Sequence, residues 1–134
     1  MATPDAQNIR NVALLSHSGA GKTSLAESLL FNVQATTRIG RVEDGNTVSD
    51  YEAEEIKRGG SIQTTLLSIT ENDSKINLLD TPGYDDFLGE VVSALRVVEG
   101  AVIVVAAPTG VDVGTERAWN MCESAQIPRM IVVN

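Results

Sequence analysis

The most constraining feature of this sequence is a phosphate-loop signature at residues 16–23, Ser-His-Ser-Gly-Ala-Gly-Lys-Thr. The general pattern is Gly, any four residues, then Gly-Lys-Ser/Thr, and only its first position departs here, where Ser16 replaces glycine. An apolar stretch, Ile9–Ser16, predicts a buried strand before the loop, and helical spacing from Gly21 to Val33 predicts a helix after it. A loop in this position aims glycine-rich backbone and a helix N-terminus at an anion.

Each part of the signature has a predicted role. The backbone N–H groups of the loop surround phosphate, Lys22 supplies a mobile cation for the β- and γ-phosphates, and the Thr23 hydroxyl ligates Mg²⁺. His17 is the only histidine of the chain, and we expect its backbone rather than its ring to face the phosphates. The nucleotide-binding candidates of this loop are Ser16, His17, Ser18, Gly19, Ala20, Gly21, Lys22, Thr23 and Ser24.

A second phosphate element is predicted at Asp80-Thr81-Pro82-Gly83, directly after the apolar stretch Ile76–Leu79. An acidic residue at the end of a strand beside a phosphate loop holds Mg²⁺ directly or through water, and this role falls to Asp80. The backbone N–H of Gly83 is placed to meet a γ-phosphate. A glycine there also changes torsion easily when the phosphate leaves, which is typical of a switch.

The hydrophobic spacing predicts strands that alternate with helices. We expect further strands at Ile62–Thr70, Lys75–Asp80, Ala101–Ala107 and Met130–Val133, with a hairpin turn at Glu71–Ser74, and helices at Asp85–Val98 and Val113–Ala125. This order indicates an α/β layered fold of the P-loop NTPase class with a mostly parallel sheet. Because the chain ends directly after an apolar strand, we expect that the last strand and helix of the domain lie beyond residue 134.

Residues 34–60 show no sustained period and predict a long loop with a helical turn near Glu52–Lys57. Six acidic residues and no basic one lie between Glu43 and Glu55, which is typical of a solvated, flexible loop. A mobile switch segment is the alternative interpretation. On the predicted helices, Glu27, Glu90 and Glu116 are expected on solvated faces.

Composition limits the classes of function. The net charge of −8 argues against a basic face that grips DNA or RNA within this chain. The longest apolar run, Ala101–Ala107, is far shorter than the roughly 20 residues that span a bilayer, so no membrane insertion is expected. A single cysteine, Cys122, and an N-terminus without an apolar segment fit a cytoplasmic protein. We expect residues 1–8 to be a flexible leader and residues 9–134 to form the partial nucleotide-binding domain.

Together these motifs resemble a translational GTPase, most closely the N-terminal nucleotide domain of elongation factor G and its paralogues. The resemblance runs from about Asn8 to Asn134, and it rests on five stretches in the family's order. They are Ser16–Thr23, Arg58–Ile62 (RGGSI), Asp80–Tyr84, Leu95–Val104 (LRVVEGAVIV) and Ile131–Asn134 (IVVN), the start of the family's Asn-Lys-x-Asp guanine motif. The resemblance implies GTP and GDP as ligands, Mg²⁺ as cofactor, and the ribosome as partner through the full-length protein.

The resemblance also assigns roles to residues. It implies that Thr23, Ser61 and Asp80 hold Mg²⁺, with Ser61 standing where the family has threonine. It places residues 34–62 in the first switch and Asp80 and Gly83 in the second. Lys22, Gly83 and Tyr84 are the catalytic candidates; Asp80, Gly83 and Asn134 complete the nucleotide-binding set.

Three departures from the family pattern matter. Gly19 stands where elongation factor G has aspartate. Tyr84 stands where the family has a histidine that orients the attacking water, and a phenol with a pKa of about 10 is a poor general base at neutral pH. The Lys and Asp that follow the family's asparagine are absent after Asn134, so the residues present do not establish a preference for guanine. Gly19 and Tyr84 together favour a divergent paralogue over the principal translocase.

Four functions therefore remain open from the sequence. The leading one is a Mg²⁺-dependent GTPase whose hydrolysis drives a switch on the ribosome, in translocation or a related step. A nucleotide-binding switch with little or no hydrolysis follows if Tyr84 cannot replace histidine. An ATP-using phosphate-loop protein is possible because the loop does not read the base. The fourth is an inactive, truncated fragment.

Overall fold

The computed structural model describes residues 5–134, and residues 1–4 lie outside the described part of the chain. Half of the predicted leader therefore lies outside it. Within the other half, Ala6–Asn8 form one 3₁₀ turn, and the Asp5 side chain accepts a hydrogen bond from the N–H of Gln7 at 3.3 Å. Among the described residues, no helix is long and apolar enough to cross a membrane.

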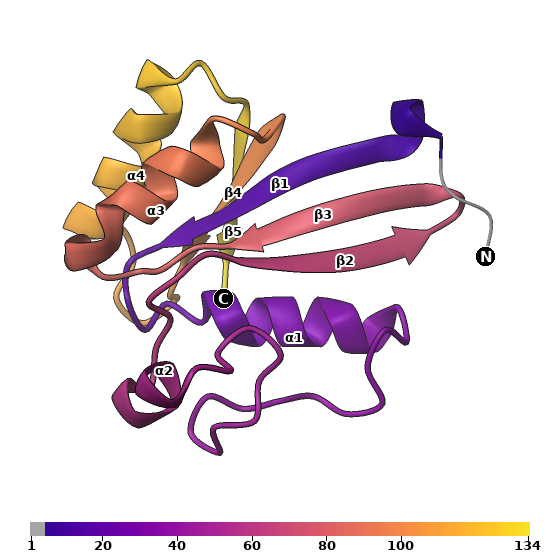
Figure 1. Ribbon diagram of the computed structural model, residues 1–134. Coiled ribbons are helices and arrows are strands. Elements are labelled where there is room, and N and C mark those ends of the chain that lie inside the picture. Colours follow the sequence, from indigo (N-terminus) through magenta and orange to yellow (C-terminus); the bar gives the residue numbers. More distant parts are fainter. Residues whose placement is uncertain (1–4) are drawn as a thin grey trace.

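Five strands form one sheet in the order β2-β3-β1-β4-β5 (Figure 1). They are β1 (Ile9–Ser16), β2 (Thr65–Glu71), β3 (Ser74–Asp80), β4 (Gly100–Val105) and β5 (Arg129–Val133). Every pairing is parallel except that of β2 with β3, which form a hairpin. Asn72 and Asp73 have φ of 48° and 64° at the turn, the left-handed torsions of a two-residue hairpin loop. The predicted mostly parallel sheet and its hairpin are confirmed.

Helices cover both faces of the sheet (Figure 1). They are α1 (Lys22–Asn32), α2 (Ala53–Arg58), α3 (Leu88–Leu95) and α4 (Val113–Ser124). The α3 and α4 helices lie on one face, and α1 lies on the other with α2 and the long 33–64 segment beyond it. The helix predicted at Asp85–Val98 is shorter than expected, because residues 85–87 form a 3₁₀ turn and α3 ends at Leu95.

The core has two parts, one on each face of the sheet. Successive side chains of a strand point to opposite faces. Accordingly, Ala13 and Leu15 of β1 pack in the cluster beneath α3 and α4, whereas Leu14 packs in the cluster beneath α1. On α3 the buried positions are Val91, Ala94 and Leu95, whereas Val92 is exposed.

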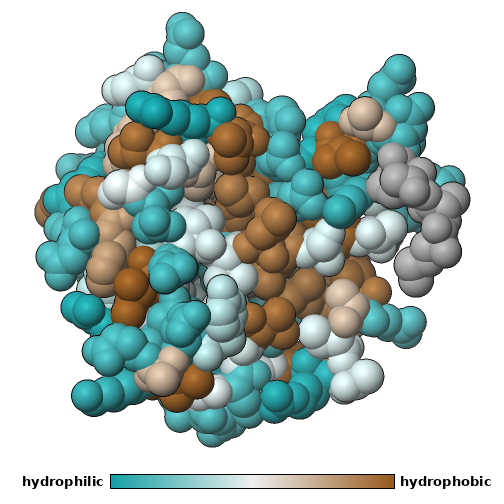
Figure 2. Space-filling view, in the orientation of Figure 1, coloured by the Kyte–Doolittle hydropathy of each residue, from teal (hydrophilic) through white to brown (hydrophobic). Residues whose placement is uncertain are grey.

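Some apolar side chains lie on the surface of the molecule. Figure 2 shows brown, apolar residues across the middle of the face drawn there, with mostly hydrophilic residues around the outline. The edge strand β5 also exposes the apolar side chains Met130, Ile131 and Val133. An edge strand with apolar side chains offers both a hydrogen-bonding edge and surface to a neighbouring segment.

We predict that Ile103→Ala lowers the free energy of unfolding by about 2–5 kcal/mol, because the side chain lies in the middle of β4 and is fully buried in the larger cluster. Val113→Ala is the control, since Val113 is 70% exposed and its truncation should change stability by less than about 0.5 kcal/mol. Urea unfolding of both variants measures the difference. Equal losses would contradict the assignment of Ile103 to the core.

Candidate phosphate site

The strand order brings the two predicted phosphate elements together. β1 and β3 are parallel neighbours, and Leu14 of β1 is in register with Asp80 of β3. The loops that follow the two strands therefore leave the sheet at the same edge. Thr81 fixes the second loop to the first strand, because its hydroxyl donates a hydrogen bond of 2.7 Å to the carbonyl of Leu14.

Backbone torsions explain the glycines of the phosphate loop. Gly19 and Gly21 have φ of 82° and 88°, in the left-handed region that glycine adopts without a steric penalty. Gly21 is the N-cap of α1, so the loop leads directly into the helix N-terminus. A Cβ on Gly83 would lie 2.9 Å from the backbone nitrogen of Ser18, so only glycine lets the second element approach the loop this closely.

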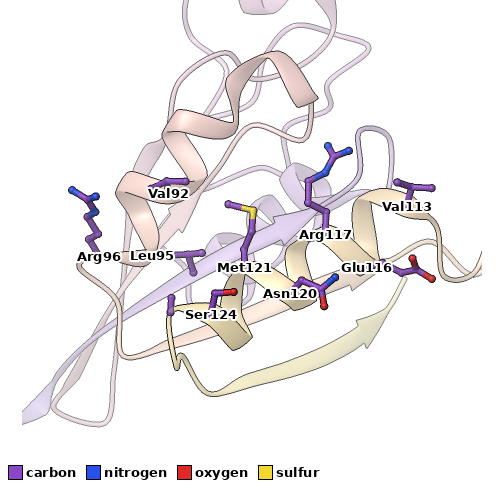
Figure 3. A pocket seen from close by; sticks show the side chains of 10 residues that line it. Val92, Leu95, Arg96, Val113, Glu116, Arg117, Asn120, Met121 and Ser124 are labelled. Carbon is purple, nitrogen blue, oxygen red and sulfur yellow. The ribbon is translucent and has the colours of Figure 1, made fainter.

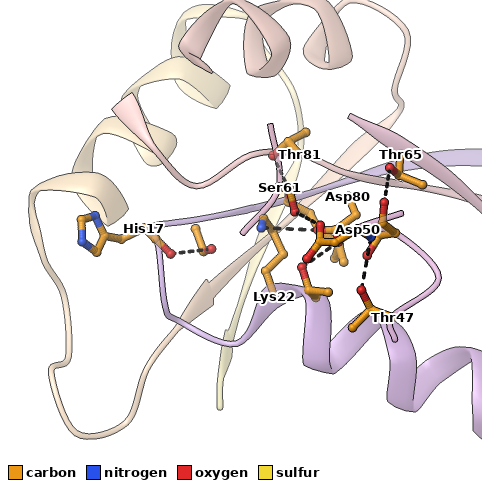
Figure 4. Close-up of polar contacts among 12 residues, drawn as sticks. His17, Lys22, Thr47, Asp50, Ser61, Thr65, Asp80 and Thr81 are labelled. Carbon is orange, nitrogen blue, oxygen red and sulfur yellow. Dashed lines mark hydrogen bonds and ion pairs between the residues drawn. The ribbon is translucent and has the colours of Figure 1, made fainter. Parts of the chain in front are cut away.

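A buried polar cluster lies under the loop (Figure 4). The Lys22 ammonium lies 3.4 Å from Oδ1 of Asp80, and the Thr23 hydroxyl donates a hydrogen bond of 3.0 Å to Oδ2 of the same carboxylate. All three side chains are buried. The structure thus brings together the cation, the hydroxyl and the carboxylate that the sequence assigned to phosphate and Mg²⁺ binding.

A second hydroxyl–carboxylate pair faces the first. Ser61 donates a hydrogen bond of 2.6 Å to Oδ1 of Asp50, and Oδ2 of Asp50 is buried without a hydrogen-bond partner among the described residues. Burial raises the pKa of Asp50 above its ordinary value, and the negative charges of Asp80 and Glu55 raise it further. The Ser61 hydrogen bond and Lys22 act in the opposite direction.

Sequence reasoning missed Asp50, since it assigned the acidic stretch from Glu43 to Glu55 to a solvated loop. The predicted solvent exposure is wrong for Asp50 and Glu55, which are buried, and correct for Glu43, Asp44, Glu52 and Glu54, which are exposed. The Glu55 carboxylate accepts hydrogen bonds from the N–H groups of Ile62 and Gln63, at 2.9 and 3.2 Å. The usable signal was the Asp-x₄-Glu spacing just before Ser61, which places two acids beside a predicted metal ligand.

Two of the three helical glutamates also differ from expectation. Glu27 of α1 is 1% exposed, and its carboxylate accepts hydrogen bonds from the N–H groups of Gly40 at 2.8 Å and Val48 at 2.5 Å. Glu90 of α3 accepts a hydrogen bond of 2.8 Å from the N–H of Thr64. The reason is the same in both cases, because each carboxylate satisfies backbone donors of the 33–64 segment. Glu116 is exposed, as predicted.

The two elements and the 33–64 segment enclose a cavity of about 200 Å³. Its lining includes Ser16, Ser18, Gly19, Ala20, Gly21, Lys22, Thr23, Ser24, Ser61, Gly83 and Tyr84 among the predicted residues, and Val42, Glu43, Asp50, Gly59 and Gly60 besides. Water occupies roughly 30 Å³ per molecule in the liquid, so the space exceeds that of a single solvent molecule several times. A polar, glycine-walled cavity at a helix N-terminus is suited to phosphate groups.

Two predicted nucleotide-binding residues, His17 and Asn134, are not part of the lining of this cavity. His17 is exposed, and its ring points away from the polar cluster (Figure 4) toward Gly114 at the start of α4, where a Cβ would lie 2.9 Å from Nδ1. Asn134 lies against the loop, and its side-chain amide donates a hydrogen bond of 3.2 Å to the carbonyl of Ala20.

A larger hollow than the phosphate cavity lies between α3 and α4 (Figure 3). It measures about 640 Å³, and Val92, Leu95, Val113 and Met121 supply its apolar lining. Arg117 at its edge forms an ion pair with Asp85. None of the phosphate-site residues lines this groove.

The donor atoms of the phosphate site fit Mg²⁺. Among residues 5–134 no cluster of three or more His, Cys, Asp or Glu side chains forms a complete metal site. The phosphate site offers hard oxygen donors instead, from the Thr23 and Ser61 hydroxyls and from Asp80 and Asp50, whose buried Oδ1 and Oδ2 respectively have no hydrogen-bond partner among these residues. Mg²⁺ is typically bound by one or two such protein ligands together with substrate phosphates and water.

Comparison with known proteins identifies the family. The family model described as "Elongation factor Tu GTP binding domain" matches residues 7–134. The chain belongs to this family. The predicted resemblance to translational GTPases and the P-loop NTPase fold are thereby confirmed.

Two individual relatives and one solved structure support this family assignment. The chain is 42% identical over its full length to ribosome-releasing factor 2, mitochondrial, from Danio rerio, and 38% identical to elongation factor G from Granulibacter bethesdensis. It matches a crystal structure of a Thermus thermophilus protein with a TM-score of 0.90 and 45% identity over 93% of its residues. It spans 18%, 19% and 19% of the lengths of these three proteins.

We predict that Asp50→Asn becomes more stable relative to the wild type as the pH rises from about 4 to about 7. Because the pKa of Asp50 is raised in the folded protein, the unfolded chain releases the Asp50 proton near pH 3.8 and the folded protein releases it only at higher pH. The wild type therefore has its full folding stability below pH 3.8 and loses part of it as the pH rises through the folded-state pKa of Asp50. The amide carries no charge, and Oδ1 still accepts from Ser61. Urea unfolding of both proteins without Mg²⁺ measures the effect, worth about 1.4 kcal/mol per unit of pKa shift. A pH-independent difference would refute it.

Proposed function

We propose that the chain binds GTP and GDP in the phosphate cavity, and that it hydrolyses GTP with Mg²⁺ in a reaction that switches the 33–64 and 80–90 segments. The observation that supports this most directly is the convergence of Lys22 and Thr23 on Asp80. The ammonium, the hydroxyl and the carboxylate come from two elements that are distant in sequence, and all are buried beneath the glycine loop.

Lys22 and the backbone of residues 18–23 would hold the phosphate chain. The Lys22 ammonium pairs with Asp80 at 3.4 Å, which is a loose contact for a buried pair. A phosphate oxygen offers the ammonium a stronger, charge-assisted hydrogen bond. Gly83, packed on Ser18, would add its N–H at the γ-phosphate end of the loop.

Thr23 and Ser61 would hold Mg²⁺ through their hydroxyls, with Asp80 and Asp50 as the carboxylates behind them. Mg²⁺ bound there would neutralise charge that develops on the β- and γ-phosphate oxygens during transfer to water. The protein's own part is to orient the two hydroxyls, which it does through the 3.0 Å and 2.6 Å hydrogen bonds to the carboxylates.

The ribosome is the proposed partner of the full-length protein. Two relatives carry the names ribosome-releasing factor 2 and elongation factor G, which favours a ribosomal step after initiation. Gly19 and Tyr84 favour a paralogue over the principal translocase. We propose a cytoplasmic location from the sequence, while the name of the Danio rerio relative favours a mitochondrion.

The alternative functions differ in whether Tyr84 supports GTP hydrolysis and in whether the protein recognises the nucleotide base. A nucleotide-binding switch with negligible hydrolysis would act by occupancy alone. An ATP-using protein remains an alternative because the phosphate loop does not contact the base. Equal binding of GDP and ADP would mean that the base is recognised by residues beyond Asn134. An inactive fragment would bind neither nucleotide.

We predict that Lys22→Ala weakens GDP binding about tenfold to a hundredfold, because it removes a charge-assisted hydrogen bond worth roughly 1.5–3 kcal/mol. Titration of fluorescent GDP with Mg²⁺, competed by unlabelled GDP and ADP, measures it. Lys75→Ala is the matched control, because Lys75 lies at the opposite end of β3 from Asp80 and should bind GDP like the wild type. Equal affinity of the Lys22 and Lys75 variants would sink the phosphate-site assignment.

We predict that Tyr84→His raises ribosome-stimulated GTP hydrolysis by about 10²-fold, the lower end of the range for a positioned acid–base group. Histidine is the side chain used most often for a proton transfer of this kind. Single-turnover hydrolysis with the full-length protein, with and without ribosomes, is the measurement. Equal stimulated rates in the two proteins would show that Tyr84 does not limit the reaction.

A further inference from the structure

Arg58 is held by side chains that directly follow the second phosphate element. It is the last residue of α2, and its guanidinium carbon lies 5.2 Å from the centre of the Tyr84 ring and 5.3 Å from that of Phe87. Its Nη2 also lies 3.8 Å from Oδ2 of Asp86. We call these four side chains the Arg58 cage. A guanidinium within about 6 Å of an aromatic face is attracted by the ring electrons.

The backbone next to Arg58 follows the same surface. A Cβ on Gly60 would lie 2.9 Å from Cε2 of Tyr84, so the chain passes directly over the ring. Tyr84 therefore forms both a wall of the phosphate cavity and a wall of the cage. Its ring is occupied by contacts with residues 58–60.

A second contact holds the other end of this stretch. The Glu90 carboxylate accepts the hydrogen bond of Thr64 N–H at 2.8 Å, and Glu90 lies one helical turn after the cage residues. Residues 58–64 are thus fixed at both ends by residues 84–90. Ser61 lies between the two contacts, and its hydroxyl points into the polar cluster (Figure 4).

We propose that the Arg58 cage and Glu90 form a two-point clamp that positions Ser61 over the phosphate cavity. Arg58 and Glu90 are positioning residues, and the ring of Tyr84 is a part of the clamp. The role of Ser61 as a Mg²⁺ ligand rests on the proposed function, whereas the clamp itself does not. Residues 58–64 then move away from the cavity only after the Arg58 guanidinium has separated from the rings of Tyr84 and Phe87.

The rate of trypsin cleavage after Arg58 measures how firmly the clamp holds this side chain. The protease must take the Arg58 side chain into its own specificity pocket before it cuts the Arg58–Gly59 bond. In the full chain without nucleotide, we expect Phe87→Leu to speed this cleavage about twofold to fivefold, the factor for one cation–π contact at an exposed site. Phe87→Tyr keeps the ring and should cleave like the wild type. Glu90→Ala should speed cleavage, and Glu90→Gln, which retains an oxygen acceptor, should not.

Two controls separate the clamp from general loosening. Phe31→Leu makes the same substitution on α1, where the ring is 41% exposed, and should leave cleavage after Arg58 unchanged. Cleavage after Arg38 in the same digests is the internal reference, since Arg38 is exposed and outside the clamp. Equal rates for Phe87→Leu and Phe87→Tyr, or a parallel rise at Arg38 and Arg58, would overturn the clamp.

Nucleotide release tests the positioning role. Phe87→Leu and Glu90→Ala should speed dissociation of a non-hydrolysable GTP analogue more in the presence of Mg²⁺ than in its absence, because Ser61 is proposed to act through Mg²⁺. Equal acceleration with and without Mg²⁺ would overturn the positioning role. If the wild type binds no nucleotide, the proposed function fails, while the trypsin result still decides whether the clamp exists.

Discussion

The phosphate site depends on the parallel pairing of β1 with β3. Because Leu14 and Asp80 share one register position, the loop after β1 and the carboxylate at the end of β3 leave the sheet side by side. A shift of one residue would turn Asp80 to the other face, since side chains alternate along a strand. The same alternation buries Leu14 on the α1 side and Leu15 on the other, so core packing and site geometry fix one register together.

Buried charge is the cost of this arrangement. Asp80 is balanced by Lys22 and Thr23. The Asp50 carboxylate accepts one hydrogen bond, from the Ser61 hydroxyl, and its second oxygen has no hydrogen-bond partner among the described residues. Desolvation disfavours the ionised form, which is why the pKa of Asp50 is raised. A site with two carboxylates and one ammonium is suited to binding a cation and a phosphate chain together. The cation offsets the negative charge of the phosphates, and the phosphates offset the positive charge of the cation.

Local patterns predicted most of the fold and some of the side chains that meet in the polar cluster. The phosphate loop and the Asp80–Gly83 element are contiguous signatures, and hydrophobic periodicity located every strand and the three longer helices. Glu27 and Asp50 could not be found in this way, because each acts on residues from another part of the chain. Helical spacing is blind to a carboxylate that is buried by a loop folding over it, and Glu27 satisfies donors 13 and 21 residues away.

These carboxylates explain how a long acidic segment is held in one conformation. Glu27 and Glu90, which lie outside the 33–64 segment, take hydrogen bonds from backbone N–H groups at Gly40, Val48 and Thr64. Every residue other than proline has a backbone N–H donor, so almost any residue could stand at these three positions. These contacts therefore constrain the path and the length of the segment, and they place little constraint on which side chains it carries. Side-chain identity then matters mainly at Asp50, Glu55, Arg58 and Ser61, where the segment contributes its own groups to the cavity, to its own fold and to the clamp.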